Sequence, residues 1–172
     1  HGKAWSWGYN YSGQLGHNND TYYSTPVAVC GNHTFCKVVN TGRAPLGLDK
    51  DGKVWGWGYN QYGELGNNTI ATVYSTPIAI YGTKTFCKID CGFNNSIGID
   101  NHGKAWSWGY NLDGQLGDNT TISKRTPIAV CGNHTFCQIG CGYKHTLAID
   151  NHGKGWGWGY NNFGQLGDNT ID

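Results

Sequence analysis

Short stretches of alternating apolar and polar residues run through this chain, and this pattern predicts β-strands. The segment 85–92 reads TFCKIDCG. Cys87, Ile89 and Cys91 should share one face of its strand, because side chains alternate along a strand. No stretch places apolar residues at helical spacing over three turns. We therefore predict an all-β chain.

Short sequences return along the chain at a nearly constant spacing. Four W-x-W pairs occur, and their first tryptophans are separated by 50, 51 and 50 residues. Repetition at this period is typical of solenoids, propellers and arrays. We expect one domain over residues 1–172, with three full repeats of about 50 residues and a partial fourth. The paired tryptophans are Trp5, Trp7, Trp55, Trp57, Trp106, Trp108, Trp156 and Trp158.

Each repeat is predicted to contain four short strands joined by turns. The second and third repeats show them most clearly, with strands at 76–80, 85–92, 96–100 and 104–111. The first of these strands begins with T-P, and proline fits there because it has no N–H to donate to a neighbouring strand. A unit is therefore expected to begin with the T-P strand and to end with the tryptophan strand.

The W-x-W pairs indicate how the sheets pack. Both tryptophans of a pair should point to one face of their strand, and the Ser or Gly between them to the other. Indoles can then be buried against the small-residue face of the next sheet, and each buried tryptophan removes on the order of 200 Å² from water. We predict a β-propeller of four-stranded blades with all the paired tryptophans in its core. The small residues are Ser6, Gly56, Ser107 and Gly157.

Composition narrows the classes of partner. Charged residues make up 13% of the chain, and the formal net charge is +1 without a basic run. This distribution does not supply the positive field expected of a protein that binds nucleic acid or an anionic membrane surface. The longest apolar runs have the length of strands, so we predict no insertion into a membrane. Phosphate-loop and zinc-protease motifs are absent, and we predict no cofactor.

The seven cysteines are interpreted mainly as small buried apolar side chains. Residues four apart on one strand lie roughly 13 Å from each other, which is too far for a disulfide. A zinc site would need closely paired ligands such as C-x2-C. A hairpin disulfide between Cys30 and Cys36, or between Cys131 and Cys137, stays an alternative. The odd count leaves at least one free thiol in a monomer.

The repeated motifs resemble the repeat of the regulator of chromosome condensation (RCC1) family. They are G-K-x-W-x-W-G-x-N-x-x-G-Q-L-G, T-P-x-x-V and F-x-x-I-x-x-G-x-x-H-T-L-A-I-D. The resemblance covers the whole chain, and residues 132–172 follow it almost without change. It implies a propeller of four-stranded blades, usually seven.

Two departures from the family pattern matter. About 3.4 repeats cannot close a ring of seven blades. The chain is therefore expected to be a fragment of a longer protein or, as the second alternative, to form a homodimer that completes a ring. The G-x-x-H-T motif is complete only at 142–146, whereas 92–96 lacks the histidine and the first repeat carries Arg43 and Pro45 instead.

No catalytic constellation is visible, and we predict that the protein is not an enzyme. Glu64 is the only glutamate and stands where the other repeats have glutamine. The aspartates before the hairpins are typical turn residues. The resemblance implies two classes of function, namely binding or scaffold propellers and guanine-nucleotide exchange factors for small GTPases. Exchange factors of this family use a protruding hairpin, and the regular spacing of the repeats leaves no room for one. Binding or scaffolding is therefore the predicted function, and exchange activity is the alternative.

The loops that follow G-x-L-G vary in length and chemistry while their flanks stay constant, as expected of loops that carry function on a rigid scaffold. We predict that they bind a protein or a surface ligand, for example a glycan.

Low charge and many Asn and Thr residues suit a virion, cell-surface or secreted protein, whereas free cysteines favour a reducing compartment, so the localisation stays open. No catalytic, cofactor-binding or metal-ligating residue is predicted. The candidate ligand-binding residues are Tyr22, Tyr23, Arg43, Tyr74, Lys124 and Arg125.

Overall fold

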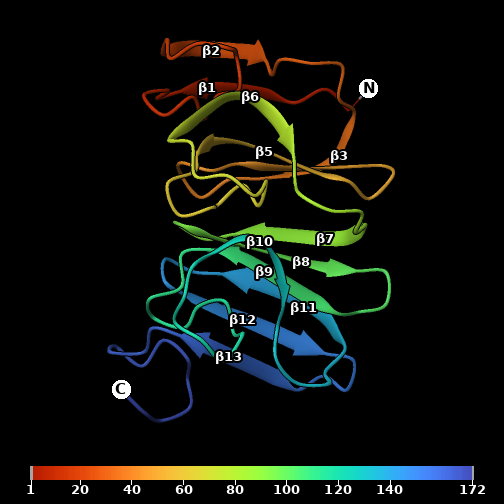
Figure 1. Cartoon of the computed structure of the whole chain (residues 1–172), viewed down its shortest axis with the longest axis vertical. Helices are drawn as coiled ribbons and strands as arrows, with labels where there is room; N and C mark the ends of the chain where they lie inside the picture. The colour runs from red at the N-terminus through yellow and green to blue at the C-terminus, as the bar shows by residue number, and fades with distance from the viewer. Residues whose placement is uncertain (1, 172) are drawn as a thin grey trace.

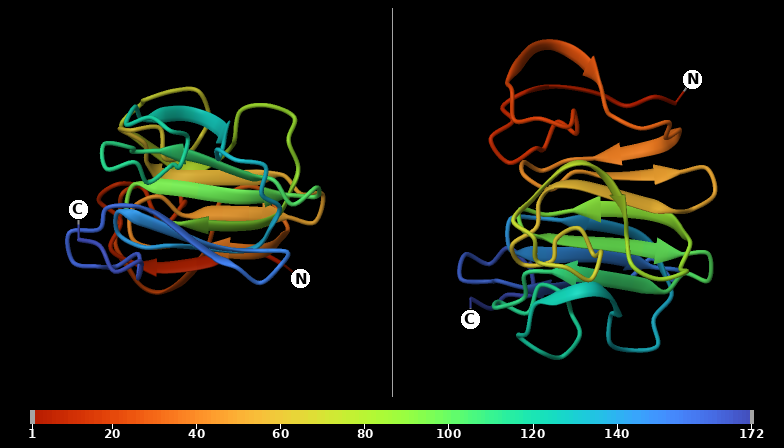
Figure 2. Two further views of the ribbon diagram at one scale, coloured as in Figure 1. Left: turned by 90° about the horizontal axis from the view of Figure 1, so that it is seen from below. Right: turned by 45° about the horizontal axis from the view of Figure 1, so that its top comes forward.

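The computed structural model describes residues 2–171, which fold into thirteen β-strands and no helix. The strands form four antiparallel sheets that are stacked in chain order (Figure 1). Figure 2 shows the same succession from two other sides.

The first sheet contains β1 (Trp5–Gly8) and β2 (Tyr23–Ala28), and the second contains β3 (Phe35–Val39), β4 (Leu46–Asp49), β5 (Val54–Tyr59) and β6 (Val73–Ala79). The third contains β7 (Phe86–Cys91), β8 (Asn95–Asp100), β9 (Ala105–Gly109) and β10 (Lys124–Ala129), and the fourth contains β11 (Phe136–Cys141), β12 (His145–Asp150) and β13 (Gly155–Gly159).

Each complete sheet begins with the strand that starts at the phenylalanine of T-F-C and ends with the T-P strand. The T-P strand β6 pairs with the tryptophan strand that precedes it, so that Ala79 lies opposite Trp55. Our prediction that a unit begins with the T-P strand is therefore wrong by one strand. The T-P strand is instead the edge strand of its sheet, where the missing N–H of Pro77 removes no internal ladder bond.

A β-bulge shifts the alternation near the start of β7. Phe86 lies opposite Asp100 and Lys88 opposite Ile99, which leaves Cys87 as the extra residue. Phe86 is therefore buried together with Ile89, and Cys87 is exposed. The prediction that Cys87 shares a face with Ile89 is wrong for this reason.

The seven cysteines are free thiols, and Cys91 alone among them is buried, so the interpretation as buried apolar side chains holds for one residue.

The second tryptophan of each pair packs against a loop of the preceding repeat. The indole Nε1 of Trp108 donates a hydrogen bond to the backbone oxygen of Glu64 over 2.8 Å. Its ring lies against Gly66, where an added Cβ would be only 2.9 Å from Cδ1 of the indole. A larger residue in place of this glycine would displace the tryptophan. Equivalent contacts join Trp57 to Gly16 and Trp158 to Gly117.

The small residues between paired tryptophans do not receive these indoles, contrary to our prediction. They make room for the leucine of their own G-x-L-G loop, which folds back over the sheet. A Cβ on Gly56 would lie 3.0 Å from Leu65, and the Ser107 hydroxyl donates to the backbone oxygen of Leu116 over 2.6 Å.

The tryptophans differ in burial according to their place in the stack. Trp57 and Trp108 are 2% and 0% exposed and belong to the apolar layers between sheets. Trp5 and Trp7 are 57% and 59% exposed, because no sheet of the described residues precedes β1. Our prediction of a core position is therefore wrong for this pair. The half-buried indoles are Trp55, Trp106, Trp156 and Trp158.

Candidate binding face

A buried asparagine fixes the loop after each tryptophan strand. Asn111 Oδ1 accepts a hydrogen bond from the N–H of Leu116 over 2.8 Å. Its Nδ2 donates to Asp118 Oδ1 over 3.0 Å and to the backbone oxygen of Thr120 over 2.9 Å. The loops are thus held from inside, and the residue before each asparagine is presented on a rigid support. The equivalent asparagines are Asn10, Asn60 and Asn161, each of which accepts a hydrogen bond from the corresponding leucine.

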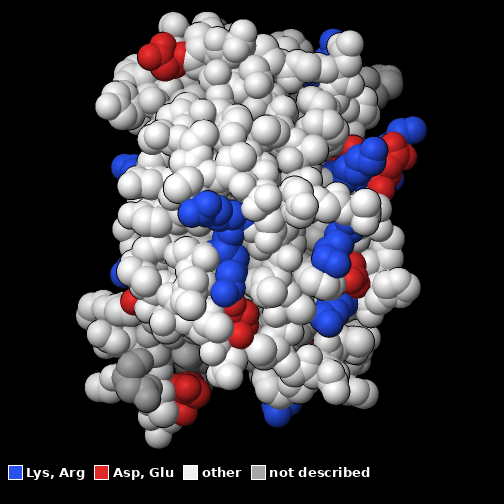
Figure 3. All heavy atoms as spheres, viewed as in Figure 1, with Lys and Arg blue, Asp and Glu red and all other residues white. Residues whose placement is uncertain are grey.

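Exposed aromatic side chains gather at the edge of the sheets where the tryptophan strands end. In Figure 3 this is the left edge, which carries few charged atoms, whereas Lys and Asp side chains gather at the opposite edge, at the hairpin turns. Tyr143 is 61% exposed and Phe163 is 84% exposed. We call this surface the aromatic face. It comprises Tyr9, Tyr11, Tyr22, Arg43, Tyr59, Tyr62, Phe93, Tyr110, Tyr143, Lys144, Tyr160 and Phe163.

Aromatic contacts on this face pass from one sheet to the next. Tyr62 of the second sheet meets Tyr110 of the third edge-on, with ring centroids 4.9 Å apart. Phe93 of the third sheet stacks on Tyr143 of the fourth at 4.5 Å. These rings border a groove of about 110 Å³ that also includes Asn94. The buried Oδ1 of Asn94 has no hydrogen-bond partner among the described residues.

Two cations occupy equivalent loop positions on the aromatic face. The guanidinium carbon of Arg43 lies 5.5 Å from the ring centres of both Tyr59 and Phe93. Lys144 Nζ lies 5.3 Å from the ring centre of Tyr160 and 3.2 Å from a carboxylate oxygen of Asp113. The hydrogen bond and the charge of Asp113 raise the pKa of Lys144. The face thus holds one cation paired with a carboxylate and one stacked between rings.

The six predicted ligand-binding residues do not form one patch. Tyr22 packs against Tyr9 in a tilted arrangement with ring centroids 4.9 Å apart and thereby joins the aromatic face, as Arg43 does. The hydroxyl of Tyr23 instead accepts a hydrogen bond from Asn19 over 3.1 Å, within its own loop.

The remaining three candidates lie on the edge strands β6 and β10, beside the aromatic face rather than among its rings. The hydroxyls of Tyr74 and Thr69 share a hydrogen bond of 2.8 Å. Lys124 forms an ion pair of 3.3 Å with Asp118, and Arg125 follows it on β10. That these side chains bind a ligand stays a prediction.

Sequence reasoning missed the tyrosine that follows each W-x-W-G. Strict alternation would place this tyrosine beside the tryptophans in the core. The glycine before it adopts positive φ, 91° at Gly58 and 100° at Gly109, and the strand register shifts there. The tyrosine therefore turns out of the sheet. Four repetitions of W-G-Y-N were the available signal.

The aspartates before the hairpins fix tryptophans rather than build a reactive site. Asp100 Oδ2 accepts the indole N–H of Trp106 over 2.8 Å, and Oδ1 accepts backbone N–H groups of His102 and Lys104. Burial opposes ionisation of Asp100, but these hydrogen bonds outweigh it and hold its pKa below the ordinary value. Within residues 2–171 no three His, Cys, Asp or Glu side chains are grouped to hold a metal, and no helix could cross a membrane.

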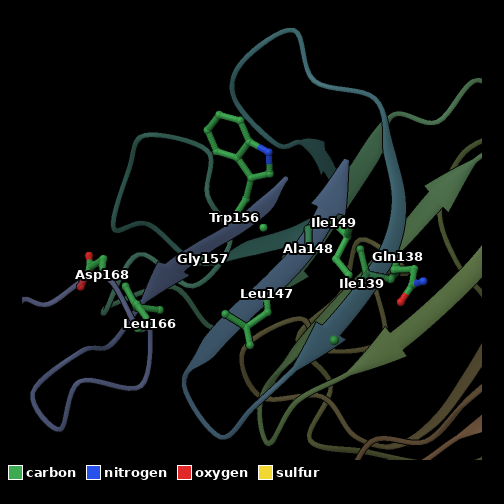
Figure 4. A pocket seen from close by; sticks show the side chains of 12 residues that line it. Gln138, Ile139, Leu147, Ala148, Ile149, Trp156, Gly157, Leu166 and Asp168 are labelled. Carbon is green, nitrogen blue, oxygen red and sulfur yellow. The ribbon is translucent and has the colours of Figure 1, made fainter. Parts of the chain in front are cut away.

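The outer side of the fourth sheet is uncovered. It forms an apolar groove of about 630 Å³ whose lining includes Leu147, Ile149 and Trp156 (Figure 4). No atom lies within 4 Å of an ideal Cβ at Gly167, whereas the equivalent Gly117 is filled by an indole. This side therefore lacks the tryptophan that covers the other sheets.

Family models match most of the chain. The model of the regulator of chromosome condensation (RCC1) repeat matches residues 1–40, 51–99 and 102–149. A second model of the same repeat matches residues 86–115 and 136–165. The matched segments follow the repeats that were recognised from the tryptophan spacing.

Relatives and solved structures agree with these matches. The RCC2 homolog of Danio rerio is 30% identical over 132 residues, which cover 69% of this chain and 25% of the relative. Human RCC2 is 30% identical over 122 residues, covering 69% of this chain and 23% of the relative. The chain thus spans about a quarter of the length of these relatives.

Solved structures confirm the predicted fold. Human WBSCR16 superposes with a TM-score of 0.88 at 25% identity, over 99% of this chain and 46% of that protein. Yeast RCC1 (Prp20), solved with Kap60, gives a TM-score of 0.85 at 21% identity, over 99% of this chain and 43% of that one. The four sheets are consecutive blades of a partial β-propeller. By its repeats and its fold, this chain belongs to the regulator of chromosome condensation (RCC1) repeat family.

Proposed function

We propose that this chain is a non-enzymatic binding module that holds a protein partner on its aromatic face. The observation that carries the proposal is the run of half-buried and exposed rings from the second sheet to the fourth, with exposed Arg43 stacked among them. Tyrosine and arginine are enriched among the residues that dominate protein–protein binding energy. Neither side chain requires a bound cofactor for this role.

The support beneath the face favours binding. Each loop is held by the internal hydrogen bonds of its asparagine, so little backbone freedom is lost when a partner docks. Yeast RCC1 (Prp20) has been solved bound to Kap60, and the solved structure of Prp20p was described together with its binding to Gsp1p and histones. A protein partner is therefore consistent with what related propellers bind.

The double variant Phe93→Ser/Tyr143→Ser is expected to lose at least tenfold in partner capture, because both rings of the inter-sheet stack are removed. The measurement is the amount of protein that cross-links to the immobilised chain. Only proteins that excess soluble chain displaces are counted. Tyr81→Ser is the matched control, since Tyr81 is 58% exposed but follows β6 at the hairpin edge. Equal capture by the double variant and the wild type would exclude the aromatic face.

Guanine-nucleotide exchange stays the alternative function. The relationship to Prp20 and RCC2 is the observation that keeps it in view. Exchange activity would accelerate the release of a fluorescent nucleotide from a panel of small GTPases. A pure binding module would bind its partner without that acceleration, so the assay separates the two functions.

The glycan ligand and the homodimer predicted from the sequence stay predictions. For a homodimer, the exposed Trp7 of one copy would enter the open position at Gly167 of another, as Trp158 enters at Gly117. Sedimentation equilibrium should then give twice the mass of 18.8 kDa, and Gly167→Leu should restore the monomer. A monomeric mass for the wild type at micromolar concentration would exclude this association.

A further inference from the structure

We propose that Arg43 is a receptor for a carboxylate on an acidic peptide segment of the partner. The inference rests on the proposed function and names the chemistry that the aromatic face recognises. Three observations carry it: the orientation of the guanidinium against two rings, the absence of an internal counter-ion, and the groove beside it, which is lined by aromatic rings and Lys144.

The orientation of Arg43 is set by two sheets. Tyr59 belongs to the same sheet and Phe93 to the next, and each ring centre lies 5.5 Å from the guanidinium carbon. A guanidinium that stacks on aromatic rings keeps its N–H groups free at the rim of its plane, where a carboxylate accepts two of them in parallel. A guanidinium held in this way loses little conformational freedom when it binds a carboxylate.

The backbone of Arg43 is fixed as well. Its carbonyl oxygen accepts the N–H of Tyr59 over 2.8 Å. The same oxygen lies directly against Gly58, where an added Cβ would collide with it. On the other side, the N–H of Gly42 donates to Asn40 Oδ1 over 2.9 Å. The loop therefore presents Arg43 from a single position.

A comparison within the chain shows what Arg43 lacks. Lys144 holds the equivalent position in the fourth sheet and pairs with Asp113 of the preceding sheet at 3.2 Å. The residue equivalent to Asp113 in the first sheet is Ser12, which carries no charge. Among the described residues the ion pairs are those of Lys144 and Lys124, so Arg43 has no carboxylate partner. The position that a carboxylate fills beside Lys144 is left to a ligand beside Arg43.

The surroundings favour a peptide over a phosphate-rich ligand. Phe93 touches Arg43 on one side and borders the groove of Tyr62, Tyr110 and Tyr143 on the other. Asn94 and Lys144 also line that groove, so it suits an aromatic side chain flanked by acidic residues. Nucleic acid binding requires many unpaired cations, and the net charge of +1 does not provide them.

The direct measurement is the Nε–H resonance of Arg43 in ¹⁵N NMR spectra of the full chain. The probes are the capped peptides EEFEE, QQFQQ and KKFKK and inorganic phosphate. EEFEE should shift this resonance in a saturable manner, and QQFQQ should bind at least tenfold more weakly. An equal response to EEFEE and QQFQQ would overturn the proposal. Displacement of EEFEE by phosphate at lower concentration would overturn the assignment to a peptide.

Two variants separate a specific receptor from general attraction to positive charge. Arg43→Lys keeps the charge but loses the planar fork, and should bind EEFEE at least tenfold more weakly. Ser12→Asp installs the counter-ion that Lys144 already has, and should block EEFEE to a similar extent. Lys50→Gln, in the exposed turn between β4 and β5 at the opposite edge of the sheets, removes a positive charge away from the aromatic face and is the control, which should bind like the wild type. Unchanged binding by Arg43→Lys would overturn the receptor role.

The outcomes distinguish this inference from the proposed function. Suppose that Phe93→Ser/Tyr143→Ser loses partner capture while Arg43→Lys and Ser12→Asp keep both capture and EEFEE binding. The binding face then stands and the carboxylate receptor is excluded. If the double variant keeps capture while the two Arg43-directed variants lose EEFEE, the peptide site is real but the partner docks elsewhere.

Discussion

Replacing Trp108 with alanine is expected to lower the free energy of unfolding by about 3–5 kcal/mol. The side chain is 0% exposed and packs against Phe86 with ring centroids 6.0 Å apart. The substitution removes this packing, opens a cavity against Gly66 and removes the indole that donates to the backbone oxygen of Glu64. Urea denaturation followed by circular dichroism measures the loss.

Trp7→Ala provides the matched comparison, because Trp7 is the equivalent residue of the first repeat. Its side chain is 59% exposed and has no preceding loop to pack against in the described chain. We expect a loss of less than about 1 kcal/mol, as for most surface substitutions. Equal losses for Trp7→Ala and Trp108→Ala would contradict the view that the indole–glycine contact between repeats stabilises the stack.

The sequence was sufficient to predict the architecture but not its detailed contacts. The spacing of the tryptophans and the strand-length alternation predicted repeated β-sheets, which the structure and its neighbours confirm. The glycine that receives each indole was assigned incorrectly, because Gly66 and Trp108 meet across a loop rather than along a strand. Alternation also failed at Cys87, where a single bulged residue reverses the faces. The period of the sequence repeat does not reveal a loop contact or a single bulged residue.

The candidate site was predictable in part. Arg43 is a candidate because it interrupts the repeat, and Tyr22 because it lies in a variable loop; both lie on the aromatic face. Tyr62 and Tyr110 escaped notice because their contact joins different sheets and depends on the turn at Gly109. Strict alternation would place the tyrosine of each W-G-Y-N beside the tryptophans, whereas positive φ at the preceding glycine directs it to the surface.

Glu64 makes the stability of the propeller depend on pH. Its side chain is 1% exposed, and Oε2 accepts the N–H of Tyr62 over 2.8 Å. Oε1 is buried without a partner among the described residues. Burial therefore raises the pKa of Glu64 to about 7, from an ordinary value of 4.5. The folded chain thus holds this proton more tightly than the unfolded chain does.

The sign of the effect follows from this difference. The stabilising contribution of protonated Glu64 is fully present below about pH 4.5, declines as the pH rises to about 7 and is absent above it. One pKa unit corresponds to about 1.4 kcal/mol, so the raised pKa amounts to about 3 kcal/mol between the two limits.

Glu64→Gln is therefore expected to raise the free energy of unfolding by up to about 3 kcal/mol at pH 8 and to leave it nearly unchanged at pH 4. Glutamine occupies this position in the other repeats and carries no charge to bury. Urea denaturation of both proteins at pH 4, 6 and 8 measures the difference. Gln115→Glu is the matched reversal, since Gln115 is also 1% exposed and accepts the N–H of Asp113 over 3.0 Å. It should lose stability above pH 7, and parallel pH profiles for the three proteins would show that Glu64 titrates alike in the folded and unfolded chain.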